Sequence, residues 1–176
     1  MKLSLNSKAP DFNLPGVDGK KYSLASFKDK PMLVIVFSCN HCPYVQAYEQ
    51  RMIDIQRDYE DQGLQFVAIN SNETKNYPED RFEKMVARAQ QKGFNFPYLR
   101  DEDQSMARAY DAACTPEFYL FDKERKLQYH GRLDDNHENP SKASKHYLRD
   151  AVEALLKGET PPRQEVHPIG CSIKWS

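Results

Sequence analysis

An apolar run that leads directly into a pair of cysteines constrains this chain more than any other feature. The run covers residues 32–37, follows a proline and is rich in β-branched side chains. A run that is apolar on both faces is typical of a strand buried in the middle of a sheet. The sequence Cys39-Asn40-His41-Cys42 follows almost at once. The chain therefore has to place two thiols beside the end of a central strand.

An amphipathic helix is predicted directly after this strand. From about residue 40 to residue 62 apolar side chains recur every three or four positions, and Gly63 provides a stop. Pro43 has no backbone N–H and is therefore tolerated only in the first helical turn. This predicts that Cys39 lies near the helix cap, where free N–H groups and the helix dipole lower the pKa of a thiol. We expect Cys39 to be the exposed, lower-pKa thiol, with Cys42 one turn along.

The remainder of the chain alternates strands and helices. A second buried strand is predicted over 64–69 and a helix over 79–92, an order that favours parallel pairing of the first two strands. Later elements are predicted as a short aspartate-capped helix, two antiparallel edge strands and an amphipathic helix, at 103–110, 117–121, 127–130 and 144–157. Together they predict one α/β domain over 1–158, with a central mixed sheet of four or five strands, helices on both faces and an N-terminal extension. Residues 159–176 contain three prolines and predict an irregular C-terminal tail that packs on or near the domain.

Charge and apolar length exclude several classes of protein. Lys and Arg number 25 against 26 Asp and Glu, and the net charge of −1 provides no footprint for nucleic acid or an anionic membrane. The longest apolar stretch, residues 31–37, is far shorter than the roughly 20 residues that cross a bilayer. No apolar segment typical of a secretory signal follows the N-terminus. We therefore expect a cytoplasmic protein, a monomer or weak dimer, with neither nucleic acid nor membrane as a partner.

The Cys-x-x-Cys spacing favours redox chemistry over metal binding. The four cysteines, Cys39, Cys42, Cys114 and Cys171, are too few for a disulfide scaffold. A structural zinc site needs four ligands, usually from two such pairs, and a second pair is missing from the sequence. We expect Cys39 to attack a disulfide, Cys42 to resolve the mixed disulfide and protonated His41 to stabilise the thiolate. Neither a metal nor an organic cofactor is expected, so electrons would come from a partner dithiol.

The other two cysteines allow more than one interpretation. A lone cysteine is most often a small buried apolar residue, which fits Cys114, although nearness to the pair would let it act as a modulating thiol. Cys171 lies in the tail and is either a third, resolving or exchanging thiol or part of a packed anchor. In the second case Ile169, Ile173 and Trp175 would bury apolar area. The sequence leaves both alternatives for Cys171 open.

Several motifs resemble the thioredoxin superfamily. The strand–CxxC–helix unit and Thr115-Pro116 ahead of a hairpin carry the general resemblance, and residues 9–12, 37–44 and 169–175 resemble the redoxin and peroxiredoxin-like group of AhpC/TSA type. The resemblance implies a thioredoxin-like fold and a thiol-disulfide oxidoreductase acting on protein or small-molecule disulfides. It also implies a cis Thr115–Pro116 bond facing the CxxC, where the backbone before the proline pairs with a bound peptide. We expect Thr115, Pro116 and Asn40 to bind substrate.

The resemblance also brings in a second mechanism. In peroxiredoxins a cysteine followed by proline reduces peroxide, a pattern that corresponds to Cys42-Pro43, and a threonine stands where this chain has Cys39. An arginine completes that site, for which Arg132 is a candidate. Thioredoxins bury a carboxylate beneath the pair, whereas residues 33–37 offer none. The alternatives to disulfide exchange are thus a thiol peroxidase using Cys42 and a non-catalytic redox-sensing domain.

Overall fold

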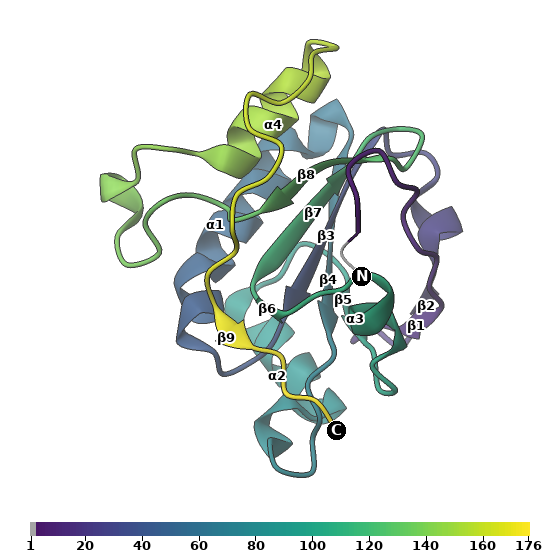
Figure 1. Ribbon diagram of the computed structural model, residues 1–176. Helices are drawn as coiled ribbons and strands as arrows, with labels where there is room; N and C mark the ends of the chain where they lie inside the picture. Colours follow the sequence, from purple (N-terminus) through teal and green to yellow (C-terminus); the bar gives the residue numbers. More distant parts are fainter. Residues whose placement is uncertain (1–2) are drawn as a thin grey trace.

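A five-stranded mixed sheet forms the centre of the computed structural model, which describes residues 3–176 (Figure 1). Its strands, in the spatial order β5–β4–β3–β7–β8, are Tyr98–Arg100, Leu64–Asn70, Met32–Ser38, Glu117–Phe121 and Leu127–Gly131. β5, β4 and β3 pair in parallel, whereas β7 and β8 are antiparallel to their neighbours. The predicted mixed α/β sheet is confirmed. Of the two predicted edge strands, only β8 is an edge, because β7 pairs with β3 inside the sheet.

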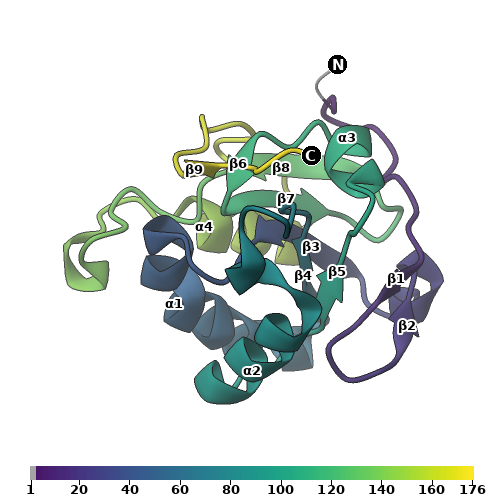
Figure 2. The same cartoon turned by 90° about the horizontal axis from the view of Figure 1, so that it is seen from below.

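Helices cover the two faces of the sheet unequally (Figure 2). One face packs against α1 (Pro43–Tyr59), α2 (Phe82–Lys92) and α4 (Tyr147–Leu156). The other packs against α3 (Ser105–Ala109) and the N-terminal segment, which contains β1 (Leu14–Pro15) and β2 (Lys21–Tyr22). Short 3₁₀ turns cover 24–27, 60–62, 78–80 and 140–142. None of the helices formed by residues 3–176 is both long enough and apolar enough to span a membrane.

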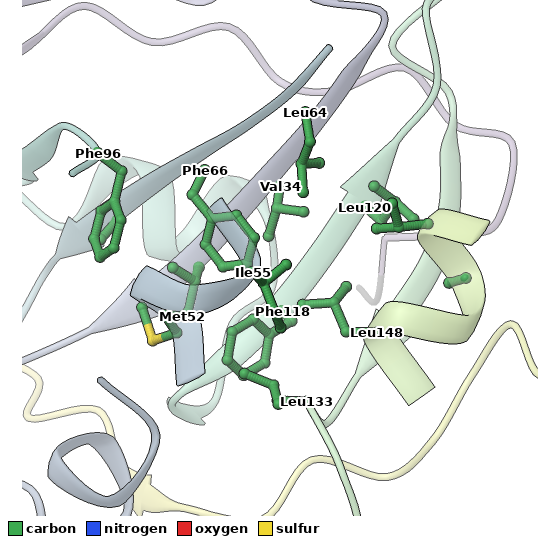
Figure 3. Close-up of a cluster of buried hydrophobic side chains, with 14 of the residues drawn as sticks. Val34, Met52, Ile55, Leu64, Phe66, Phe96, Phe118, Leu120, Leu133 and Leu148 are labelled. Carbon is green, nitrogen blue, oxygen red and sulfur yellow. The ribbon is translucent and has the colours of Figure 1, made fainter. Parts of the chain in front are cut away.

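The alternation of side chains along β3 divides the core into two layers. Val34 faces α1 and α4, where it belongs to the same cluster as Ile55 and Leu148 (Figure 3). Leu33 and Ile35 point to the opposite face, and all three strand residues have no exposed surface. Full burial of such a side chain contributes roughly 1.5–3 kcal/mol. The strand that delivers the cysteines is therefore fixed on both faces.

The start of α1 differs from the prediction. Pro43 occupies the first helical position, and the N-cap residue is Cys42, with extended φ and ψ of −71° and 126°. A residue before proline is pushed away from helical angles, so the helix cannot begin earlier. Cys39 therefore lies one turn before the cap rather than at it. The predicted stop is confirmed, because Gly63 has a left-handed φ of 93°.

The C-terminal tail lies along the rest of the molecule as an extended strap (Figure 1). Its middle part pairs with β8, through a hydrogen bond from the His130 N–H to the Gln164 carbonyl and another from the Val166 N–H to the His130 carbonyl. Gly131 permits this approach, because a Cβ there would lie 2.0 Å from the Val166 carbonyl oxygen. Farther on, Cys171–Ser172 forms β9, which pairs with β6 (Cys114–Thr115).

Candidate active site

A disulfide joins the long helix to the tail. It connects Cys42, the N-cap of α1, to Cys171 in β9, with Cα atoms 6.3 Å apart. This separation lies within the usual range for disulfides, about 4.4–6.8 Å. Cys39 and Cys114 are free thiols. The bond expected between the two cysteines of the CxxC is therefore replaced by one to the tail, because β9 brings Cys171 against the start of α1.

The tail cysteine lies beside the CxxC, and part of its segment packs against the core. Cys171 is bonded to Cys42, whereas its role as an exchanging thiol stays a prediction. Ile173 is a packed anchor, with 3% of its surface exposed in the core layer beneath α3. Ile169 and Trp175, in contrast, are 43% and 45% exposed. The tail is held by the covalent bond, by the short strand β9, by main-chain pairing with β8 and by the buried side chains of Val166 and Ile173.

The environment of Cys39 contradicts the expectation of an exposed, low-pKa thiol. Only 2% of the residue is exposed, and its Sγ lies 3.5 Å from the Thr115 hydroxyl. Burial raises the pKa of the Cys39 thiol to about 11, and the charge of Asp80 adds to the rise. Hydrogen bonds from Thr115 and from the backbone of Cys42 and His41 act in the opposite direction. Cys39 is a protected thiol that nonetheless faces donors able to stabilise its thiolate.

A buried carboxylate organises the loop that carries the CxxC. Asp80 is fully buried and accepts hydrogen bonds from the Asn40 backbone N–H at 2.8 Å and from the side-chain amides of Asn70 and Asn72 at 3.0 Å each. Asn72 in turn accepts a hydrogen bond from the Lys174 N–H in the tail. One carboxylate thus links the end of β4, the cysteine loop and the tail. Asp80 is thus a buried carboxylate beside the CxxC, whereas residues 33–37 of the strand contain none.

His41 contacts this carboxylate through its ring, and Asn40 contacts it through its backbone N–H. The Nδ1 of His41 lies 2.9 Å from Asp80, its Nε2 lies 3.7 Å from Glu79, and 32% of its side chain is exposed. The Asn40 side chain donates to the Glu79 carbonyl at 2.8 Å and accepts from the Tyr98 hydroxyl at 2.8 Å. The side chain of Asn40, which the sequence suggested as a substrate ligand, is therefore engaged inside the protein.

One group of side chains near the disulfide has the composition of a metal site. Potential ligand atoms of Cys39, His41 and Asp80 lie within 4.8 Å of one another, the one such group found among residues 3–176. Both oxygens of Asp80, however, already accept N–H donors from Asn40, Asn70 and Asn72. A cation there would have to displace these bonds. We therefore assign no metal to this group.

The backbone before Pro116 forms a strand position that the tail occupies, which we call the groove. The Thr115–Pro116 bond is cis, as the resemblance implied. In the antiparallel pairing of β6 with β9, Thr115 stands opposite Cys171 and Cys114 opposite Ser172. The Cys42 Sγ lies 3.6 Å from the Thr115 carbonyl oxygen. The platform expected to receive a substrate strand therefore carries a strand of the same chain.

Cys114 lies beside a second buried acid. Glu117 accepts hydrogen bonds from the Cys114 N–H, the Tyr119 hydroxyl and His130. Burial raises the pKa of the Cys114 thiol to about 12, and the charge of Glu117 adds to the rise. This thiol is half-buried and donates a hydrogen bond to Glu117, so it is not the fully buried apolar residue of the first interpretation, and its role as a modulating thiol stays a prediction.

Comparison with known proteins places this site in a family. The model of the AhpC/TSA family matches residues 5–130, a span that contains the sheet, the CxxC and the cis-proline. The chain belongs to the AhpC/TSA family. A hypothetical protein of Sinorhizobium meliloti 1021 has a solved structure that is 44% identical, with a TM-score of 0.94 over 100% of this chain and 97% of that one. A solved thioredoxin domain from Bacteroides vulgatus, 18% identical with a TM-score of 0.62 over 72% of this chain and 86% of that one, shows the shared thioredoxin-like fold.

Curated relatives of this chain carry two kinds of name. The thiol-disulfide oxidoreductase ResA of Geobacillus thermodenitrificans is 27% identical over 72% of this chain and 68% of its own length. A putative peroxiredoxin of Mycobacterium tuberculosis is also 27% identical, over 67% of this chain and 70% of its length. The proteins similar to this chain thus carry names from both chemistries that the sequence suggested.

Proposed function

We propose that this protein exchanges disulfides through a centre of three cysteines, in which Cys42 bonds to the substrate and Cys39 resolves the bond. The protein is a thiol-disulfide oxidoreductase of the thioredoxin-like fold. The observation that carries the proposal is the bond between Cys42 and a cysteine on the strand paired with Thr115. That strand lies where an added substrate strand would lie. The roles predicted for the two CxxC thiols are reversed in this proposal.

The geometry supports each step of the exchange. A thiolate at Cys42 faces the first turn of α1, where free N–H groups and the helix dipole stabilise negative charge. It attacks one sulfur of a substrate disulfide, forms a mixed disulfide and releases the other sulfur as a thiolate. The Cys39 thiolate then attacks the Cys42 sulfur, which forms the Cys39–Cys42 disulfide and expels the substrate thiolate, and the latter takes up the proton lost by Cys39. A dithiol donor reduces the resulting disulfide.

The tail cysteine gives a second candidate function a specific basis. In a thiol peroxidase, peroxide would oxidise the Cys42 thiolate to a sulfenic acid, and the Cys171 thiol would condense with it to give the observed disulfide and water. Cys42 is followed by Pro43, as the family pattern of peroxide reduction requires. The threonine that the family pattern has three residues before the cysteine is replaced by Cys39, and Arg132 stays the candidate for the arginine of such a site. Because this threonine is missing, we rank peroxide reduction second.

A paired assay on four proteins separates the two functions. Wild type and the variants Cys39→Ser, Cys42→Ser and Cys171→Ser would be tested for reduction of a protein disulfide and for consumption of hydrogen peroxide with a dithiol donor. We expect Cys42→Ser to lose disulfide reduction by at least about 100-fold, and Cys39→Ser to accumulate a mixed disulfide at Cys42, visible by mass spectrometry.

Two outcomes would overturn parts of this proposal. Disulfide reduction that survives in Cys42→Ser and vanishes in Cys39→Ser would restore the original roles of the two thiols. Rapid peroxide turnover that needs Cys42 and Cys171, survives in Cys39→Ser and exceeds disulfide reduction in wild type would make the protein a peroxidase instead.

A further inference from the structure

The tail occupies its groove as a peptide ligand would, through main-chain pairing. β9 pairs with β6 in antiparallel register, and the Ile173 N–H donates to the Ala113 carbonyl at 3.0 Å. Main-chain pairing of this kind provides affinity for an extended segment, while pockets for alternate side chains provide specificity. The way in which the side chains of the tail fit the groove therefore shows which segments the groove accepts.

The residue before the tail cysteine is limited to glycine by the backbone of the groove. A Cβ at Gly170 would lie 2.1 Å from the Thr115 carbonyl oxygen, 2.7 Å from its carbonyl carbon and 3.3 Å from the Pro116 nitrogen. These are main-chain atoms, and Glu117, the next residue, is held in the sheet by its pairing with Phe37. The floor cannot retreat as a flexible side chain would. Any residue other than glycine at this position must lift the segment off the platform.

The position two residues after the cysteine requires a buried apolar side chain, whereas the position before the cysteine excludes any side chain. Ile173 is 3% exposed and belongs to the core layer that also contains Ala107 and Tyr110. Ser172, between Cys171 and Ile173, is exposed, as the alternation of an extended strand requires. A charged side chain in the place of Ile173 would be desolvated without a partner. The groove thus distinguishes the three side-chain positions around the cysteine, those of Gly170, Ser172 and Ile173, by size, exposure and polarity respectively.

From these contacts we infer that the preferred substrate is an extended protein segment with the pattern glycine, disulfide-bonded cysteine, any residue, aliphatic residue, and that the tail is its tethered competitor. This inference rests on the proposed function and adds the substrate class. In the exchange, Cys42 attacks the cysteine of this segment, the second half of the substrate disulfide leaves as a thiolate, and Cys39 then releases the segment as a thiol. The tail, attached to the same chain, competes at a high effective concentration, so it must leave before a segment binds.

The inference is tested with three peptides and with variants in which the tail no longer occupies the groove. The peptides are Ile-Gly-Cys-Ser-Ile-Lys, the same peptide with alanine before the cysteine, and the same peptide with aspartate in the place of the second isoleucine. Each carries 2-nitro-5-thiobenzoate on its cysteine, and the release of this chromophore is followed by absorbance. The enzymes are reduced full-length wild type, Cys171→Ser, and the double variant Gly170→Ala with Cys171→Ser, whose added Cβ displaces the tail.

We expect the glycine peptide to react at least tenfold faster than either altered peptide in all three enzymes. We also expect the double variant to react with the glycine peptide at least fivefold faster than Cys171→Ser, because its tail no longer competes. The discrimination persists in the double variant because it depends on the Thr115 carbonyl and not on the tail. Cys171→Ser retains Gly170 and so reports the preference even if the double variant folds poorly.

The failures of the two proposals are distinguishable by a small disulfide, 5,5′-dithiobis(2-nitrobenzoate). If the enzymes reduce it and the three peptides react at equal rates, the substrate class is wrong and disulfide exchange stands. If glycine is preferred but the double variant gains no rate, the tail is not a competitor and that half of the inference is overturned. If neither the small disulfide nor any peptide reacts, both the proposed function and the inference fall.

Discussion

The two cysteines of the disulfide are held in very different ways. Cys42 stands between a fully buried strand and a 17-residue helix, and the loop before it is fixed by the buried Asp80. Cys171 stands on a two-residue strand at the surface, among neighbours such as Ile169 and Trp175 that are nearly half exposed. Elements with few buried contacts and exposed hydrogen bonds open at low free-energy cost. One half of the bond is therefore fixed and the other can leave.

This difference assigns the two CxxC thiols to the fixed part of the molecule and access to them to the tail. The fixed half contains both CxxC thiols. Cys171 of the tail packs against the cluster formed by Cys39, Cys42 and Val45, so we expect release of the tail to make the centre more accessible. The predictions below are directed first at the fixed half and then at the tail.

Asp80→Ala tests the fixed half and should have the largest effect. Removal of the carboxylate leaves three buried N–H donors, on Asn40, Asn70 and Asn72, without their acceptor. Each such donor costs about 1–3 kcal/mol, so we expect the free energy of unfolding to fall by about 4 kcal/mol in urea titration. Glu83→Ala, on the exposed face of α2, is the control and should change it by less than about 0.5 kcal/mol. Equal effects of the two substitutions would show that Asp80 does not organise the loop.

Cys171→Ser tests what the covalent bond contributes to the tail. The bond closes a loop with a sequence separation of 129, and disulfides typically contribute about 2–4 kcal/mol by restricting the unfolded chain. We expect the variant to be about 3 kcal/mol less stable than oxidised wild type in urea titration. Reduced wild type is the matched control and should resemble the variant. Indistinguishable stability of the variant and oxidised wild type would mean that the tail is held without the bond.

A pH titration of the reactivity of Cys39 tests whether the fixed half protects this thiol. In oxidised Cys114→Ser, Cys39 is the single free thiol. Because burial raises the pKa of Cys39 to about 11, its thiolate fraction and its rate of modification by iodoacetamide should rise about tenfold per pH unit from pH 7 to pH 9. The hundredfold change corresponds to about 2.7 kcal/mol. A rate that levels off near pH 7 would instead reveal a low-pKa thiol and contradict the protected state.

Trp175→Ala should have the smallest effect of the series. The indole is 45% exposed, and its described ring contact is with the Arg108 guanidinium, 5.3 Å from the ring centroid. Exposed contacts of this kind contribute roughly 0.5–1 kcal/mol. We expect the free energy of unfolding in urea titration to fall by at most about 1 kcal/mol. Peptide mapping should still find the bond between Cys42 and Cys171. A loss as large as that of Cys171→Ser would place the anchor of the tail at its end rather than at the bond.

Much of the scaffold could be predicted from the sequence because its signals are local. The buried strand at 32–37, the helix that ends before Gly63 and the parallel strand at 64–69 follow from side-chain periodicity and from glycine stops. The predicted start of α1, at about residue 40, is too early, because the helix begins at Pro43 and the periodic apolar positions begin only at Val45. Boundaries depend on one or two residues, whereas element types depend on many.

The site was less predictable because its decisive contacts join distant segments. The pairing of Cys42 with Cys171 cannot be read from spacing, since any two of four cysteines can pair. Asp80 lies at the start of the helix predicted over 79–92, where periodicity gives no sign of a buried carboxylate, yet one signal pointed to it: the polar residues 70–72 end a strand parallel to the one that delivers the CxxC. The carboxyl ends of neighbouring parallel strands meet at one edge of a sheet, so those residues had to lie beside the cysteines.

The long sequence separation of the two disulfide cysteines gives the oxidation state a mechanical signature. A chain pulled by its termini while oxidised can extend only over the residues before Cys42 and after Cys171. The 129 residues of separation between them remain a closed loop, which carries no load. Reduction releases this loop and adds about 440 Å to the contour length at roughly 3.4 Å per residue. The fully extended lengths of the reduced and the oxidised chain would thus differ by several times the diameter of the folded domain.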